Sequence, residues 1–382
     1  MSARILHVAA LPFPSSQGTQ AALLAIVRAV AEDAAARGER VALLTYEAGD
    51  GRALLPANVE HRRTHAPVSN RSLRSGPSLA KIAEDAALVR ALREAPEPEI
   101  VAHHVEAGLA CVLAGRRFTW VAHTALGPEL PLYAPGRAAL APLLSLAGES
   151  LDRFVATRAA RVLAISPFLA RRIEARTGVR ARVLPTPWPV AKPIEEGERA
   201  AARTALGLEA DHEVVLYAGN LDHYQGLDTA VGALGALAHR RGRLRWLVAS
   251  ESTPDLLLAM ADRAGIRGRV VLAPLEDDVQ RRRAHAAADL AIVPRRLEAG
   301  VSIKILEALA HGLPTVAVRA ATGGFPLEDA CRLVDDDASA LAAAIGEVLT
   351  EPFVRLALTA AGPAHLARDH GPRACLEALE GR

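Results

Sequence analysis

The sequence predicts an α/β protein built from two doubly wound parallel sheets, and three observations support this fold class. The chain has 382 residues, which is more than one ordinary hydrophobic core accommodates. Hydrophobic residues make up 51% of it and charged residues 23%, enough apolar material for a large interior. Short apolar runs of strand length alternate with helical periodicity along the chain, and a proline-rich break separates two such series.

The first series begins with a strand, a loop, a helix and a second strand. Residues 4–10 are an apolar run, residues 11–20 are rich in proline, serine and glycine, and residues 21–37 have helical periodicity. The further elements that we expect in this half are strands at 41–46, 100–103, 120–123 and 161–165 and helices at 80–95 and 137–158. This alternation is typical of a parallel sheet with crossover helices.

The break between the series is marked by four prolines, because proline continues neither a helix nor a central strand. They are Pro185, Pro187, Pro189 and Pro193. We therefore expect one Rossmann-like domain at residues 1–187 and another at 188–360, with residues 361–382 as a C-terminal helix for which a return to the first domain stays open. The expected strands of the second domain are 213–218, 245–249, 269–272, 290–293 and 315–318, and its helices are 227–238, 255–264, 277–288, 302–311, 338–349 and 354–381.

Composition argues against several classes of protein. Aromatic residues make up only 3% and the net charge is +2, which does not suit a nucleic-acid platform. The three cysteines are widely spaced and lack metal-ligand spacing, so we expect a reducing cytoplasm. No secretion signal or membrane span is apparent. The apolar stretch 138–151 lacks a basic face, so we expect it to be buried, although peripheral membrane contact stays open.

Several fragments keep the order and spacing of a known family over about 300 residues. They are Pro12-Phe13-Pro14, Gln17-Gly18-Thr19-Gln20, residues 102–107, residues 122–124, Tyr217-Ala218-Gly219-Asn220-Leu221, Tyr224-Gln225-Gly226-Leu227-Asp228 and, most specific, residues 293–314. With them the sequence resembles the retaining glycosyltransferases of family 4, in a branch with the form Tyr-Gln-Gly-Leu-Asp. The resemblance implies a GT-B fold, in which two Rossmann-like domains face a cleft, the first binding an acceptor and the second a nucleoside diphosphate sugar.

Segment 294–314 resembles the donor-binding motif of that family. We expect Ser302 to be the N-cap of a helix, with Val301 beside it, so that backbone N–H groups at the helix start bind a diphosphate. The resemblance implies that Glu307 accepts hydrogen bonds from the ribose hydroxyls and that Glu298 contacts a sugar hydroxyl. Eight residues separate these glutamates where the family usually has seven, so a solvated loop carboxylate is the alternative for Glu298.

Two positions depart from the family, which usually places an arginine and a lysine there to bind the donor phosphates. The residues here are Asn220 and Gln225. Because a charge-assisted hydrogen bond is stronger than a neutral one, another cation has to compensate. Lys304 is the first candidate, and Arg295 and Arg296 are the next.

Candidate residues of the first half follow from the same resemblance. Gly18, in the first loop, allows close approach of a phosphate or the transferred sugar. His123 is implied to contact the donor sugar. His103 and His104 are candidates for acceptor binding; as neighbours in a strand they would point to opposite faces, so we expect no metal site there. In the second half, Leu275 matches a position for nucleobase contacts, mostly through backbone atoms.

The function that we expect is transfer of a hexosyl or related residue from a nucleoside diphosphate sugar to an acceptor, with retention at the anomeric carbon. No Asp-rich metal motif is present, so we expect neither a metal nor another cofactor. A catalytically impaired GT-B protein that binds a ligand or partner is one alternative, and a sugar-nucleotide epimerase is another. The nucleobase, the sugar, the acceptor and the oligomeric state cannot be read from the sequence.

Overall fold

The structure is a computed structural model, and it describes residues 3–14, 18–49, 55–66, 79–133, 138–298 and 300–381. The chain forms two compact units. The first comprises Met1–Pro187 and Pro372–Arg382, and the second comprises Trp188–Gly371. Gln17, which belongs to one of the fragments that carry the resemblance, lies outside the described residues.

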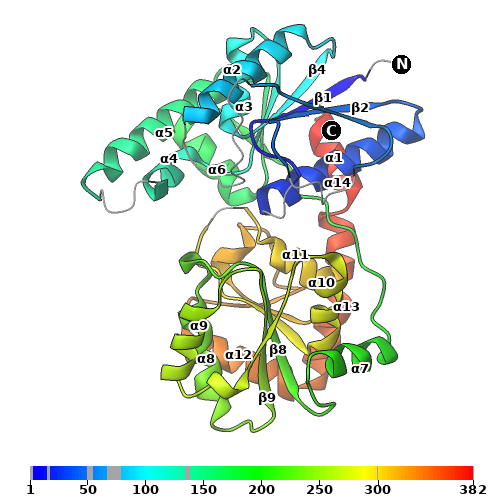
Figure 1. Cartoon of the computed structure of the whole chain (residues 1–382), viewed down its shortest axis with the longest axis vertical. Coiled ribbons are helices and arrows are strands. Elements are labelled where there is room, and N and C mark those ends of the chain that lie inside the picture. The colour runs from blue at the N-terminus through cyan, green and yellow to red at the C-terminus, as the bar shows by residue number, and fades with distance from the viewer. Residues whose placement is uncertain are drawn as a thin grey trace. The chain divides into compact units, whose positions relative to one another are not determined.

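The first unit contains a seven-stranded sheet in which every pair of neighbours is parallel, in the order β3-β2-β1-β4-β5-β6-β7 (Figure 1). Its strands are β1 (Ile5–Ala9), β2 (Val41–Thr45), β3 (Val59–Arg63), β4 (Glu99–His103), β5 (Thr119–Ala122), β6 (Arg161–Ala164) and β7 (Ala181–Val183). Its longer helices are α1 (Gly18–Ala36), α2 (Leu79–Glu94), α3 (His104–Leu113), α5 (Ala141–Ala156), α6 (Pro167–Thr177) and α14 (Pro372–Glu380), and α4 (Leu126–Glu129) is short.

The second unit contains a six-stranded sheet of the same kind, in the order β10-β9-β8-β11-β12-β13. Its strands are β8 (Glu213–Ala218), β9 (Leu244–Ala249), β10 (Val270–Ala273), β11 (Leu290–Val293), β12 (Thr315–Val318) and β13 (Arg332–Val334). Its helices are α7 (Glu196–Ala205), α8 (Leu227–Ala238), α9 (Asp255–Arg263), α10 (Asp278–Ala287), α11 (Ile303–Ala310), α12 (Ala338–Thr350) and α13 (Pro352–Asp369).

Strand β8 shows why the central strands read as unbroken apolar runs. Val214 and Leu216 belong to one hydrophobic cluster, which includes residues of α7 and α10. Val215 and Tyr217 belong to another, which includes residues of α8 and α12. Because successive side chains of a strand alternate between the faces of a sheet, a sheet covered on both faces needs apolar residues at every position.

Helix α14 belongs to the first unit although it closes the chain. It lies beside α1 (Figure 1). Its Cys375 and Leu379 are part of the same hydrophobic core as β1 and β4, and the Leu379 carbonyl accepts a hydrogen bond from Arg161 at 2.5 Å. The preceding helix α13, which contains residue 361, remains in the second unit, and a break at Gly371 separates the two helices.

The leucines of segment 138–151 are more exposed than the sequence suggested. Leu143 and Leu146 are 64% and 61% exposed, and Leu140 and Leu151 are also exposed. The expected burial of this stretch is therefore wrong, because α5 packs on its neighbours through residues such as Gly148, Asp152 and Val155 instead. Within the described ranges, no helix is both long enough and apolar enough to span a bilayer.

Candidate functional site

In each unit the strand order reverses at one place, and ligands of doubly wound sheets bind beside such a reversal, at the carboxyl ends of the strands. In the first unit the reversal lies between β1 and β4, and in the second it lies between β8 and β11. The residues predicted from the sequence follow these strands. Asn220 comes shortly after β8, and Lys304 lies at the start of the helix after β11.

The candidate residues of the second unit form a cluster around Lys304, which includes Tyr217, Asn220, Gln225 and Arg295. The Lys304 Nζ donates a hydrogen bond of 3.1 Å to Gln225 Oε1 and lies 5.5 Å from the centre of the Tyr217 ring. Burial, with the nearby charge of Arg295 as a smaller cause, lowers the pKa of Lys304 to about 8. The Lys304 side chain can take this position only because residue 219 is glycine. A Cβ on Gly219 would lie 2.3 Å from Lys304 Cε, and the φ of Gly219 is +133°.

Asn220 and Gln225 position the Lys304 side chain through hydrogen bonds; as neutral amides they do not take over the role of a cation. Gln225 donates to Asn220 Oδ1 at 2.6 Å, and Asn220 donates to Asp222 at 2.6 Å and to the Tyr224 hydroxyl at 3.1 Å. The Tyr217 hydroxyl donates to the backbone carbonyl of Asn220. The two predicted donor-binding amides therefore form a hydrogen-bonded chain that ends on the Lys304 ammonium group.

Arg295 is the second cation of the cluster. Its guanidinium donates to the Gly300 carbonyl at 3.3 Å, while its Nε has no hydrogen-bond partner among the described atoms. Burial lowers its pKa from the usual value. None of the described carboxylates lies within 4.0 Å of either Arg295 or Lys304. Arg296 differs, because it is paired with Asp228 at 2.8 Å and Asp336 at 2.6 Å.

Glu307 lies one turn beyond Lys304 on α11 and is 8% exposed. Its Oε1 accepts a hydrogen bond of 3.0 Å from Arg281 of α10. Burial raises the pKa of Glu307, and the positive charges of Arg281 and Lys304 oppose that shift. Arg281 therefore keeps one carboxylate oxygen engaged and the side chain fixed. This pair could not be predicted from the sequence, because the two residues lie on different helices.

The start of α11 differs in detail from the prediction. Ser302 is the N-cap residue, as predicted, but its side chain makes no capping hydrogen bond, and its backbone N–H donates to the Ala321 carbonyl at 2.8 Å. Val301 is buried beside it. Glu298 is exposed in the loop after β11. The position that the usual glutamate spacing would give, Ala299, lies outside the described residues.

A cavity of about 280 Å³ opens at the carboxyl ends of β9 and β10. Its lining residues are Leu221, Val248, Ser250, Ser252, Pro254, Leu272, Ala273 and Pro274. Leu275 directly follows this lining, and its own side chain is buried in the core. Ser250 and Ser252 were not predicted, since serines after a strand are common in loops.

The first unit has a cluster of four histidines: His7, His103, His104 and His123. All but His104 are at most 2% exposed. Burial lowers the pKa of His7 and of His104 to about 4 and that of His103 and His123 well below the usual value, so the rings are neutral at pH 7. His103 is bonded to a histidine through each of its ring nitrogens, so contact with an acceptor would require one of these bonds to break.

The expectation that His103 and His104 point to opposite faces of a strand is wrong. His103 ends β4, but His104 has a φ of +70° and begins α3. This left-handed turn brings the His104 ring onto His123, with ring centres 4.4 Å apart, while His103 bonds the same His123. Gly18 is the first residue of α1, the helix that follows β1.

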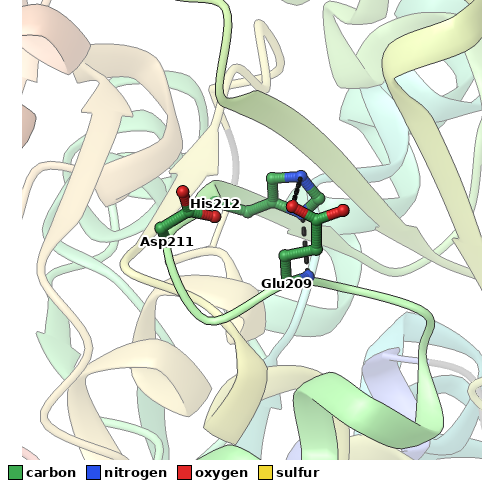
Figure 2. A group of neighbouring side chains, drawn as sticks. All are labelled: Glu209, Asp211 and His212. Carbon is green, nitrogen blue, oxygen red and sulfur yellow. Dashed lines mark hydrogen bonds and ion pairs between the residues drawn. The ribbon is translucent and has the colours of Figure 1, made fainter.

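One group of potential metal ligands was found in the described part of the chain, and it lies before β8, at the opposite edge of the sheet from Lys304. It consists of Glu209, Asp211 and His212 (Figure 2). His212 Nδ1 accepts the backbone N–H of Glu209 at 2.9 Å, so the neutral ring carries its proton on Nε2, which faces the Glu209 carboxylate at 3.7 Å. A protonated nitrogen cannot ligate a metal, so the contacts fit a local polar cluster better than a metal site.

Comparison with known proteins relates both halves of the chain to glycosyltransferases. Residues 25–190 match the model of Glycosyltransferase Family 4, and residues 212–351 match that of Glycosyl transferases group 1. A D-inositol 3-phosphate glycosyltransferase of Segniliparus rotundus is 32% identical over 182 residues, which are 45% of this chain and 40% of that protein. One from Mycobacterium sp. strain KMS is 37% identical over 137 residues, 34% of this chain and 30% of that one. The matches thus span less than half of these relatives.

Solved structures share the fold along the whole chain. Sucrose-phosphate synthase from Thermosynechococcus elongatus has a TM-score of 0.78 at 18% identity, covering 99% of this chain and 98% of its own. Anabaena HepE in complex with UDP and glucose has a TM-score of 0.74 at 18% identity, covering 99% of both chains. The chain therefore has the GT-B fold, and each of its halves is similar to a glycosyltransferase family model.

Proposed function

We propose that this protein transfers a sugar from a nucleoside diphosphate sugar to an acceptor, with retention of the anomeric configuration. One observation carries the proposal. Lys304 and Arg295 are partly buried near one another at the strand-order reversal of the second sheet, and no described carboxylate lies within 4.0 Å of either. Two neighbouring, partly buried cations without a carboxylate in contact favour an anionic ligand that neutralises them.

A diphosphate suits this charge. Transfer breaks the bond between the sugar and the diphosphate, and negative charge grows on the leaving phosphate oxygen. Lys304 and Arg295 are fixed donors for that charge, which is the electrostatic form of catalysis. They supply the role that Asn220 and Gln225 cannot, since amides are neutral. Positive charge from the protein itself favours a reaction that needs no metal.

Residues near these cations suit the other parts of a nucleotide. Glu307, oriented by Arg281, has an oxygen left for the ribose hydroxyls. The cavity lined by Ser250 and Ser252 accommodates a nucleobase, with the backbone around Leu275 as the hydrogen-bonding edge. We assign contacts with the transferred sugar to His123, Gly18 and the exposed Glu298.

The names of similar proteins guide the choice of substrates to test. HepE was solved with UDP, and the matched relatives are named D-inositol 3-phosphate glycosyltransferases. UDP-sugars and an inositol phosphate are therefore the first donor and acceptor to try. We keep a cytoplasmic location in the proposal, together with peripheral membrane contact through the exposed leucines of α5.

Calorimetric titration with UDP, GDP and ADP tests the donor site. We expect micromolar binding of one of them, lost in Glu307→Ala and kept in the control Glu328→Ala, which removes an exposed glutamate of the same unit. Incubation with the matching nucleotide sugar and acceptor, followed by NMR of the anomeric proton, tests transfer and retention. Absence of binding to every nucleotide would sink the proposal, whereas binding without turnover would favour the catalytically impaired alternative.

A further inference from the structure

Three histidines of the first unit lie on a diagonal across adjacent strands. In the register of β1 and β4, His7 is opposite Val101, two residues before His103. In the register of β4 and β5, His103 is opposite Val121, two residues before His123. A shift of two residues keeps a side chain on the same face of a sheet. The stagger therefore places the three rings in a row, each one step further toward the carboxyl edge.

Hydrogen bonds connect this row end to end. His7 Nδ1 lies 2.9 Å from His103 Nε2, and His103 Nδ1 lies 2.9 Å from His123 Nε2. The two outer atoms, His7 Nε2 and His123 Nδ1, are buried without a partner among the described atoms. His104 stacks on the His123 ring, with the ring centres 4.4 Å apart.

A neutral imidazole carries one N–H and one acceptor nitrogen, so only two proton arrangements satisfy both bonds. In the first, every ring is protonated on Nδ1, and each donates toward His123, whose own Nδ1–H points outward from the row. In the second, every ring is protonated on Nε2, and each donates toward His7, which leaves His123 Nδ1 as an acceptor. The tautomer of His123 is thus coupled to that of His7, two rings away.

We propose that His7 and His103 are positioning residues that hold His123 as its Nδ1–H tautomer, so that His123 presents a hydrogen-bond donor to an oxygen of the transferred sugar. The inference rests on the proposed glycosyl transfer and adds a role for two residues. Each arrangement leaves one buried N–H without an acceptor in the free chain, at His7 Nε2 in the second and at His123 Nδ1 in the first. Because an orphaned N–H is costly, the arrangement whose N–H gains an acceptor from the bound sugar is favoured. In the first, the outward N–H lies on His123, where a sugar hydroxyl can accept it.

The tautomers can be read directly by long-range proton–nitrogen correlation spectra of the full chain labelled with nitrogen-15 histidine. Signals are assigned by their loss in single variants. With the nucleotide sugar bound, we expect His7, His103 and His123 all to be Nδ1–H, whereas exposed histidines favour Nε2–H. Observation of Nε2–H at His123 overturns the inference.

A matched pair of variants tests the consequence for the reaction. The amide of His103→Asn can still donate to His123 Nε2. The carboxylate of His103→Asp has the same shape but only accepts, which forces the proton of His123 onto Nε2. Because a wrong tautomer removes the donor, we expect kcat of the Asp variant to fall at least tenfold below that of the Asn variant. His7→Asn and His7→Asp should show the same order, with a smaller ratio.

Two controls separate this inference from the proposed function. Binding of the nucleoside diphosphate alone depends on the second unit, so all four variants should bind it as the unaltered chain does, which also verifies folding. If the unaltered chain neither binds nor transfers, the proposed function has failed. If it transfers and the Asn and Asp variants are equally active, only the role of the histidine row has failed.

Discussion

The two strand-order reversals have the same topology and opposite chemistry. The reversal between β1 and β4 is lined by buried neutral histidines, while that between β8 and β11 holds two partly buried cations. Neutral rings suit the hydroxyl groups of a sugar, and cations suit a diphosphate. The doubly wound sheet therefore provides only the place for a ligand, and a few side chains at the strand ends decide which charge the ligand carries.

The largest expected effect is at Lys304, at the reversal between β8 and β11. Lys304→Met removes the charge and keeps the length of the side chain. Since a charge-assisted hydrogen bond contributes about 1.5–3 kcal/mol, the affinity for a nucleoside diphosphate should fall about 10-fold to 150-fold in calorimetric titration. Lys192→Met, an exposed lysine of the same unit, is the control and should bind normally. Equal affinity in both variants would contradict the assignment of Lys304.

Arg281 gives a smaller effect, because it acts on the ligand only through Glu307. Arg281→Met should weaken nucleoside diphosphate binding about fivefold, equivalent to roughly 1 kcal/mol for one hydrogen bond. Arg283→Met changes an exposed arginine on the same helix and should leave the affinity unchanged. If Arg281→Met weakens the binding of deoxyribose nucleotides as much as that of ribose nucleotides, Glu307 has no role at the ribose hydroxyls.

The two sites should also differ in their response to pH. Because the folded-state pKa of Lys304 is lowered to about 8, the unfolded chain binds more protons between pH 8 and 10.5. This lysine therefore makes the free protein more stable as pH rises through that window, while diphosphate affinity falls. The pKa of His7 is lowered to about 4, so its contribution to stability is lost as pH falls from 6.5 to 4. Denaturant titrations of the unaltered chain and of Lys304→Met and His7→Asn would separate the two windows.

The smallest effect is expected at the exposed leucines of α5, a feature outside both sites. Leu143→Ser and Leu146→Ser should change the free energy of unfolding by less than about 0.5 kcal/mol, because these side chains are already in contact with solvent. Leu88→Ala, at a fully buried position of the same unit, should cost about 2–5 kcal/mol. Sedimentation with phospholipid vesicles tests the proposed membrane contact, which the serine variants should weaken.

Much of the fold could be predicted because the central strands are apolar on both faces. The observed β8 coincides with the predicted 213–218, and β9, β11 and β12 differ from their predictions by at most one residue. Strands β3, β7 and β13 were missed. They are edge or near-edge strands, and β3 carries the polar run Val59–Arg63, so neither length nor hydrophobicity marks them. Helix α3 was missed because the sequence does not show that the chain turns at His104.

The candidate site could be predicted only in part. The sequence places Lys304 and Glu307 on one helix, since their spacing is local. It does not show that His7 meets His103, 96 residues away, or that Arg281 meets Glu307. Those contacts depend on the register between strands that are not consecutive and on the packing of two helices. Neither leaves a local pattern in the residues.

The return of α14 to the first unit has a consequence for folding during synthesis. Cys375 and Leu379 complete a core whose other members come from the first 187 residues. On the ribosome that core stays open at one side until the last helix has emerged. The second unit, a continuous segment, has all its strands by residue 334 and all its helices by residue 369, so it can close first. The first unit, although most of it is synthesised before the second, therefore completes its core after it.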